Sequence, residues 1–98
     1  MHSYTKDCEI TRWLYIEGVI ECVATYEIKL TWYRGRLDEI GPVTLIEWTL
    51  PDAGTTHNRA MAVTLMGETE VARQEAEIEQ QFRDEPPFWA TARKEYAA

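Results

Sequence analysis

Apolar and polar residues alternate without interruption over residues 20–33. Side chains of a β-strand point to opposite faces with a period of two, so this pattern predicts one long strand with a buried and a solvated face. The residues expected in the core are Ile20, Cys22, Ala24, Tyr26, Ile28, Leu30 and Trp32, and the opposite side carries Glu21, Val23, Thr25, Glu27, Lys29, Thr31 and Tyr33.

The segment before this strand, residues 9–17, is compatible with two structures. Its density of Ile, Thr, Trp and Tyr favours a strand in which Trp13 and Leu14 face opposite sides. A short helix is the alternative, with Asp7 as its N-cap and Gly18 as its end. We expect the strand, followed by a turn or bulge at Gly18.

After the long strand, Gly35, Gly41 and Pro42 punctuate the chain. They predict a loop over residues 34–42, about seven to nine residues long, which is too long for a tight hairpin but allows an antiparallel return. Residues 43–50 alternate again and predict a second core strand. Its inward residues are expected to be Ile46, Trp48 and Leu50.

A turn and a further strand are predicted next. Pro51 and Gly54 bracket a strong turn signal, because proline presets φ and glycine tolerates positive φ. Residues 60–66 then alternate, with Met61, Val63 and Leu65 on one side, and predict a fourth short strand that ends at Gly67.

Beyond Gly67 the period changes to that of a helix. Val71, Ile78 and Phe82 recur at helical spacing, which predicts an amphipathic helix over residues 68–85 with Thr69 as its N-cap. The pair Pro86-Pro87 ends this helix, and residues 87–96 predict a second short one.

Together these elements predict an α+β fold. We expect an antiparallel β-sheet of three to four strands with a C-terminal helix or helices packed on one face. The sheet should occupy about residues 9–66 and the helical region about residues 69–97, within a single domain over residues 1–98.

Composition limits the classes of protein that remain. The chain has no apolar run of the roughly 18 residues that a membrane helix needs, and its first residues lack the pattern of a signal peptide, so we expect a cytoplasmic protein. Its two cysteines, Cys8 and Cys22, lack C-x-x-C spacing, and Cys22 lies on the apolar side of the long strand. We therefore expect no disulfide framework.

Candidate catalytic and ligand-binding motifs are sparse. His57 lies near Asp52 and Thr56, but these are also turn-forming residues and His57 is the only histidine away from the N-terminus. No metal-binding spacing and no glycine-rich phosphate loop occur. We therefore expect a protein that is not an enzyme and that has no catalytic, cofactor-binding or metal-binding residues and no cofactor.

Acidic residues are the most distinctive feature. The net charge is −7, which disfavours direct binding to nucleic acid and favours a partner with a basic surface. Seven acidic against two basic residues fall in the predicted helix 68–85, and Trp89 follows it as a candidate interface anchor. The predicted partner-binding residues are Glu70, Glu75, Glu77, Glu79, Asp84, Glu85 and Trp89.

The stretch LYIEGVIECVATYEIKLTWYRGRLDEIGPVTLIEWTLPDAG, residues 14–54, resembles a layout found in small uncharacterised proteins encoded by bacteriophages and prophages. The similarity covers roughly residues 13–85: a short strand, a long alternating strand, a loop rich in Gly and Pro, another strand and an acidic helix. In length and acidity the chain is also similar to phage anti-CRISPR proteins. This resemblance implies action in the bacterial host cytoplasm by binding a nucleic-acid-handling complex, and it brings no catalytic residues.

The leading hypothesis is therefore a non-enzymatic phage-type inhibitor or adaptor. It would bind a basic, nucleic-acid-handling host protein, without contacting nucleic acid or membrane itself. The alternatives are a virion structural or assembly protein that self-associates, and an immunity protein that neutralises a nuclease toxin.

Overall fold

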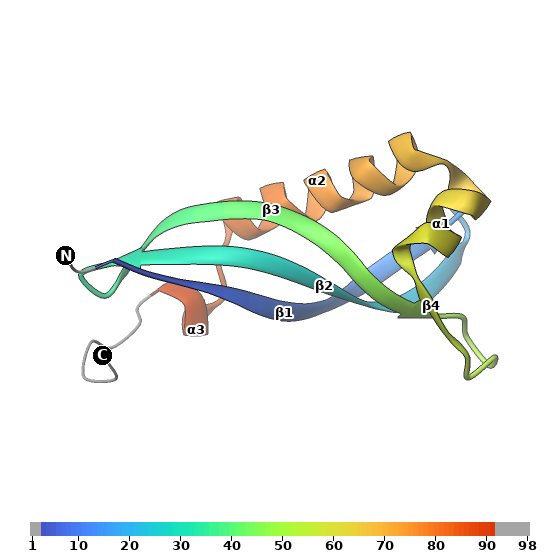
Figure 1. Ribbon diagram of the computed structural model, residues 1–98, viewed down its shortest axis with the longest axis horizontal. Helices are drawn as coiled ribbons and strands as arrows, with labels where there is room; N and C mark the ends of the chain where they lie inside the picture. The colour runs from blue at the N-terminus through green and yellow to red at the C-terminus, as the bar shows by residue number, and fades with distance from the viewer. Residues whose placement is uncertain (1–2, 92–98) are drawn as a thin grey trace.

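The computed structural model describes residues 3–91. Three long antiparallel strands form a meander, β1 (Ser3–Ile16), β2 (Ile20–Tyr33) and β3 (Arg36–Thr49), and the short strand β4 (Thr56–Asn58) extends the sheet in the order β1-β2-β3-β4 (Figure 1). Three helices follow them along the chain. The protein thus has the predicted α+β fold, with an antiparallel sheet of four strands.

The central strand β2 confirms the alternating pattern. From Cys22 to Trp32 every second side chain is buried, whereas Ile20, expected in the core, is 39% exposed at the end of the sheet. The segment before it is also a strand, so the helical alternative is wrong. β1 is longer than predicted because it pairs with β2 along its whole length, from Ser3 opposite Tyr33 to Ile16 opposite Ile20.

Two tight turns connect the long strands. Glu17 and Gly18 have φ values of 52° and 75°, and Val19 N donates to Ile16 O at 3.1 Å, the geometry of a type I′ turn. Arg34 and Gly35 repeat this conformation at 54° and 80°. The predicted loop over residues 34–42 is therefore wrong: the chain reverses within two residues, and β3 begins at Arg36.

Gly41 and Pro42 lie within β3, at a point where its pairing with β2 is irregular. The register shifts between Ile28, opposite Val43, and Leu30, opposite Ile40. A Cβ on Gly41 would lie 3.1 Å from Lys29 Cβ, a tight contact, so the close approach of the two strands favours glycine there.

A second register shift in β3 decides which residues face the core. Thr25 pairs with Glu47 whereas Tyr26 pairs with Leu45, which leaves Ile46 as the extra residue of a bulge. Ile46 is therefore 38% exposed, and the expectation that it faces the core is wrong. Leu45 and Trp48 occupy the inward positions on either side of it.

Residues 60–66, predicted as a fourth strand, lie instead in helix α1 (Arg59–Met66). Asn58 decides the outcome, because its side chain accepts a hydrogen bond from Met61 N at 3.0 Å and thereby caps the helix. Ala62 is the fully buried residue of this short helix. The fourth strand of the sheet is the preceding segment, which pairs with the end of β3.

Helix α2 (Glu68–Asp84) confirms the predicted long helix and buries Val71, Ile78 and Phe82. Its N-cap is Gly67, with φ 92°, and not Thr69 as predicted. The short helix α3 (Phe88–Thr91) follows the two prolines, and the remaining part of the predicted helix 87–96 lies outside the described residues.

The helices pack against one face of the sheet, and α2 runs beside β3 in Figure 1. Trp32 Nε1 donates to Ala90 O at 2.7 Å, which ties α3 to the buried side of β2. Within residues 3–91 no helix is both long enough and apolar enough to cross a membrane.

Two neighbouring residues of α2, Gln74 and Glu75, form hydrogen bonds to the backbone of the two outer long strands, β1 and β3. Gln74 bonds both backbone groups of Tyr15 on β1, accepting from its N–H at 3.0 Å and donating to its carbonyl at 2.8 Å. Glu75 accepts a hydrogen bond from Leu45 N on β3 at 2.7 Å. These side chains occupy backbone groups that would otherwise be open at the sheet edges.

Candidate functional site

The acidic residues of α2 divide into a buried one and several that face solvent. Glu75, predicted as a partner-binding residue, is only 8% exposed. Its carboxylate binds Arg59 Nε at 2.8 Å and Nη2 at 2.9 Å in addition to Leu45 N. Glu75 is therefore not on the surface, as a partner-binding residue would have to be, because its side chain joins α2 to α1 and to β3.

Glu68, at the start of α2, binds Arg59 of α1 at 2.7 Å, and three further solvent-facing acids have arginine partners on α2 itself. Arg73 binds Glu70 at 2.8 Å and Glu77 at 3.1 Å, and Arg83 binds Glu79 at 2.9 Å. The Arg73 guanidinium, followed by the Gln74 amide, lowers the pKa of Glu70 to about 2.

The last predicted site residues lie at the C-terminal end of α2 and in α3. Asp84 accepts a hydrogen bond from Gln80 at 2.8 Å, and Glu85 is exposed just after the helix. Trp89 is 52% exposed and meets Phe82 edge to face at 6.1 Å between ring centroids. Trp89 therefore contributes to the core on one side while its other side faces solvent.

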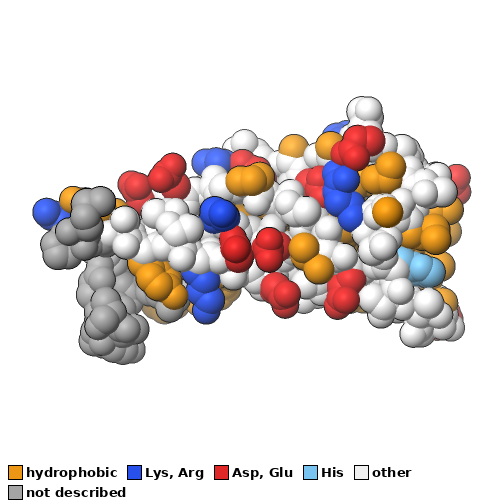
Figure 2. Space-filling view, viewed as in Figure 1, with side chains coloured by type: hydrophobic (Ala, Val, Ile, Leu, Met, Phe, Trp, Pro, Cys, Tyr) orange, Lys and Arg blue, Asp and Glu red, His pale blue; other side chains and the backbone are white. Residues whose placement is uncertain are grey.

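No helix of residues 3–91 packs on the opposite face of the sheet. We call it the outer face, and it is formed by the side chains of β1, β2 and β3 that alternate with the buried ones. Figure 2 shows acidic side chains gathered near the middle of the long strands, among scattered basic ones. The outer-face acids are Asp7, Glu9, Glu21, Glu27, Glu39 and Glu47, and the bases are Lys29 and Arg36.

A like-charged pair lies at the centre of the outer face. Glu9 is directly opposite Glu27 in the β1–β2 register, and Glu47 on β3 is opposite Thr25, two positions along β2 from Glu27. Within residues 3–91 none of these three carboxylates forms an ion pair. Lys29, the nearest base along β2, lies 3.9 Å from Asp7 instead.

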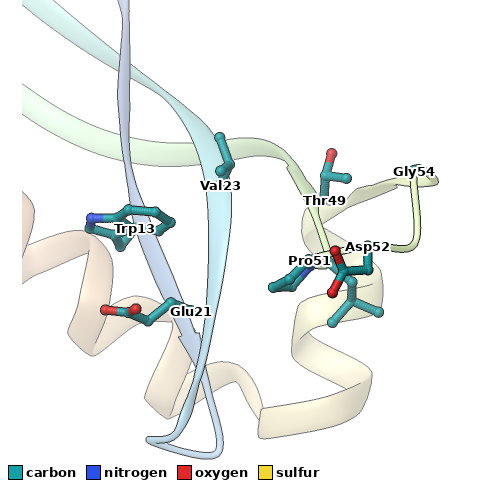
Figure 3. A pocket seen from close by; sticks show the side chains of 8 residues that line it. Trp13, Glu21, Val23, Thr49, Pro51, Asp52 and Gly54 are labelled. Atoms are coloured by element: carbon teal, nitrogen blue, oxygen red, sulfur yellow. The ribbon is translucent and has the colours of Figure 1, made fainter.

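At one end of the outer face an open groove of about 790 Å³ lies between the strands and the turn that follows β3 (Figure 3). Its floor is the row formed by Val23 and Thr49, which pair across β2 and β3. Trp13 lines one side and Pro51 the other, and the carboxylates of Glu21 and Asp52 lie along it. The groove thus combines apolar surface with two acids.

The histidine and cysteine side chains that the structure describes do not come together in one site. His57 lies in β4 and stacks on Trp48, with 4.8 Å between ring centroids. Cys22 is buried, which raises the pKa of its thiol, and Cys8 is half-buried. Among the residues that the structure describes, no group of three or more His, Cys, Asp or Glu side chains could hold a metal ion.

Comparison of the chain with models of known protein families, with curated proteins and with solved structures finds no match. A function can therefore be inferred only from the geometry and charge of the surfaces described above. The most informative is the outer face, which has uncompensated charge, exposed apolar side chains and a groove.

The sequence predicted the β2 residues of this face to be solvated but did not predict that the face is a binding site. The Glu9–Glu27 pair follows from the length of the first connection, because the three residues Glu17, Gly18 and Val19 place Ile16 opposite Ile20, which fixes every other pair of β1 and β2. The alternating acids were thus a signal in the sequence, whereas the length of the connection that pairs them was not. The groove had no such signal, because it depends on how the turn after β3 lies over β2.

Proposed function

We propose that this protein is a non-enzymatic binding protein whose outer face recognises a basic surface on a partner protein. The observation that carries the proposal is Glu9 directly opposite Glu27, with Glu47 nearby and no cation of the described residues paired with any of the three. Like charges placed opposite each other in a sheet are destabilising, by amounts of roughly 0.2–1 kcal/mol per pair. A basic partner relieves this repulsion on binding.

Electrostatic arguments also favour the outer face over helix α2 as the interface. On α2, Arg73 and Arg83 already neutralise three of the exposed acids, so a partner cation must compete with these contacts. On the outer face Asp7 is paired with Lys29, but Glu9, Glu27 and Glu47 have no competing ion pair within residues 3–91. Complementary charge of this kind speeds association and selects the partner more than it adds affinity.

The class of partner follows from its charge. Extended basic surfaces are typical of proteins that bind nucleic acid, because such proteins must neutralise phosphates. We therefore propose a nucleic-acid-handling protein as the target and inhibition by occupation of its basic surface as the effect, in the manner of a phage-type inhibitor. An immunity protein against a nuclease toxin would use the same surface.

The test compares two charge-reversal variants of equal charge change. The outer-face variant replaces Glu27 and Glu47 with Lys, which converts the Glu9–Glu27 pair into an attractive one, so its melting temperature should not fall. Wild-type protein and this variant are immobilised and exposed to bacterial lysate, and captured proteins are identified by mass spectrometry. Basic nucleic-acid-handling proteins should be retained by wild type and lost by the variant, with capture weakening as salt increases.

The matched control replaces Glu77 and Asp84 of α2 with Lys. It should retain the same proteins as wild type. Capture that survives the outer-face change but is lost in the α2 variant would place the interface on the helix, as first predicted. Capture of no basic protein by wild type, or concentration-dependent self-association in light scattering, would contradict the proposal and favour an assembly protein.

A further inference from the structure

We infer that β1 binds an extended segment of the basic partner as an additional antiparallel strand of the sheet. The segment pairs with the edge of β1 that faces away from β2, which we call the free edge. It has a basic–apolar–basic sequence, with its two basic side chains opposite Asp7 and Glu9. This inference rests on the proposed function, because it names the form in which the partner presents its positive charge.

The backbone of β1 shows which of its groups point toward the free edge (Figure 1). Gln74 binds both the N–H and the carbonyl of Tyr15, so both groups of this residue face away from β2. In an antiparallel ladder, residues that bond one neighbouring strand alternate with residues whose groups face the other side. β1 and β2 pair regularly from Ser3 to Ile16, so the backbone groups of every odd-numbered residue of β1 face the free edge.

The free edge is occupied at one end and open at the other. The Trp13 carbonyl accepts a hydrogen bond from the Tyr26 hydroxyl, and the Thr11 carbonyl accepts one from its neighbour Arg12. Within residues 3–91, the edge-facing backbone groups of the four preceding odd-numbered residues form no hydrogen bond. These residues are Ser3, Thr5, Asp7 and Glu9. They present donors and acceptors in the repeat that an added β-strand satisfies.

The opposite edge of the sheet is covered. β4 pairs with the end of β3, and the Glu75 side chain binds Leu45 N. Arg83 binds the Ile40 carbonyl farther along the same strand. β3 also has three register shifts against β2, and irregularities of this kind hinder the addition of a further strand. β1 therefore offers the regular edge that an extended segment can join.

The side chains along the free edge determine the chemistry of the segment. A residue paired with Glu9 has its side chain on the outer face, on the side of Glu9 away from Glu27. A basic residue there is attracted by both carboxylates, and a second one two positions along lies opposite Asp7. The residue between them faces the inner side of the sheet, next to the half-buried Cys8 and the buried Ile10, where an apolar side chain fits.

A second copy of β1 fits this edge less well than a basic segment. Edge-facing residues of two antiparallel strands lie opposite one another, so odd-numbered residues of one copy would pair with odd-numbered residues of the other. Self-pairing centred on any of residues 7–9 would place acids directly opposite acids, which is destabilising. The charge of the edge thus favours a partner with basic residues at alternate positions.

The test uses the peptide acetyl-Thr-Val-Lys-Val-Lys-Val-Thr-amide, titrated into the full-length protein. Hydrogen exchange is followed by NMR at saturating peptide. The amides of Thr5, Asp7 and Glu9 face the free edge, and their exchange should slow at least about ten-fold when the peptide is bound. The amides of Lys6 and Ile10, which face β2, should exchange slowly with and without the peptide.

Two methylated peptides distinguish strand addition from attraction of charge alone. Methyl groups on the backbone nitrogens of both lysines remove donors that face β1, and they should weaken binding at least about ten-fold. Methyl groups on the backbone nitrogens of the last two valines point away from β1 and should change binding by about two-fold or less. The two peptides carry the same charge.

Glu9→Gln tests the contact with the first lysine. It should weaken peptide binding about three-fold without lowering the melting temperature, because it also relieves the repulsion with Glu27. The matched control is Glu21→Gln on the same face. Glu21 lies opposite Tyr15, roughly 20 Å along the strands from Glu9 and beyond a Debye length of about 8 Å, so binding should not change.

Binding that survives methylation at the lysines, or a Glu9→Gln variant that binds as wild type, would overturn the inference. Protection of the edge amides in the free protein that increases with protein concentration would assign the edge to a second copy and would also overturn it. Lysate capture that depends on Glu27 and Glu47 would still support the proposed function, so the two can fail separately.

Discussion

Replacement of Glu75 by Ala tests how the sheet edge and the helices are joined. The Glu75 carboxylate accepts three hydrogen bonds, from Leu45 N and from Nε and Nη2 of Arg59, and it is 8% exposed. Truncation removes all three acceptor contacts at once. It leaves a backbone N–H of β3 without a partner below the helix layer.

The magnitude follows from these contacts. A buried N–H without an acceptor costs about 1–3 kcal/mol. The Arg59 side chain is 29% exposed and retains Glu68 at 2.7 Å, so the loss of its ion pair adds only about 1 kcal/mol. We expect Glu75→Ala to lower the free energy of unfolding by about 3 kcal/mol, which for a domain of this size lowers the melting temperature by roughly 12–24 °C.

Urea unfolding followed by tryptophan fluorescence measures the effect. Glu75→Gln retains one acceptor for Leu45 N and should cost about 1 kcal/mol, less than half the cost of the alanine variant. Glu77→Ala, whose side chain is 56% exposed, is the matched control and should change stability by about 0.5 kcal/mol or less. An alanine variant at position 75 as stable as this control would refute the structural role of Glu75.

Three further outcomes follow from the pKa shifts and the buried contacts. Arg73 and then Gln74 lower the pKa of Glu70 to about 2, so the stability that this residue contributes is present above pH 4.5 and is lost between about pH 4.5 and 2. NMR titration of the Glu70 carboxyl carbon should show this low midpoint, and high salt should raise the midpoint. Burial, followed by the charge of Glu75, raises the pKa of Tyr26, so folding should lose stability as pH rises above about 10, and Tyr26→Phe should reduce that loss in alkaline melting curves. Trp32→Phe leaves Ala90 O without its donor and should cost about 1–3 kcal/mol in urea unfolding, whereas an unchanged midpoint would show that α3 does not depend on this bond.

The parts of the fold that could be predicted are those with many residues of one period. The long strand β2 and helix α2 each bury one face over several repeats, so the hydrophobic pattern alone located them. Residues 60–66 of α1 are six apolar residues and one threonine, a short run that fits a strand or a helix. The cap from Asn58 decided between the two, and an asparagine before such a run is a signal that sequence analysis can weigh.

The wrong loop over residues 34–42 has a different cause. A type I′ turn needs positive φ at two residues, for which Asn-Gly is the usual sequence, and here Arg34 adopts the first position. Gly41 and Pro42, taken as loop residues, fit inside β3 because the register shifts there. Local composition could not distinguish a loop from a bulged strand. What keeps Gly41 and Pro42 within β3 is the pairing with β2, which local composition does not contain.

The structural role of Glu75 could not be predicted from the helical period of the sequence. On a helical projection it borders the apolar stripe, where a charged residue faces either solvent or the core depending on its partner. Arg59, sixteen residues earlier in the chain, supplies that partner, and the open N–H of Leu45 supplies a second. A buried carboxylate is retained only when such groups meet it, and the pattern of one helix contains no information about them.

The distribution of arginine explains why the two acidic surfaces differ. Arg59, Arg73 and Arg83 all lie in α1 and α2, and each forms an ion pair with an acid of α2. Five of the six acids of α2 thus have an arginine partner within the protein, whereas Glu9, Glu27 and Glu47 on the sheet have none among residues 3–91. Folding alone would favour a cation opposite Glu9, yet the position holds Glu27. A half-buried acid that opposes folding beside the exposed Glu9 is the reason why we propose a contact with a basic partner, which the isolated chain does not make.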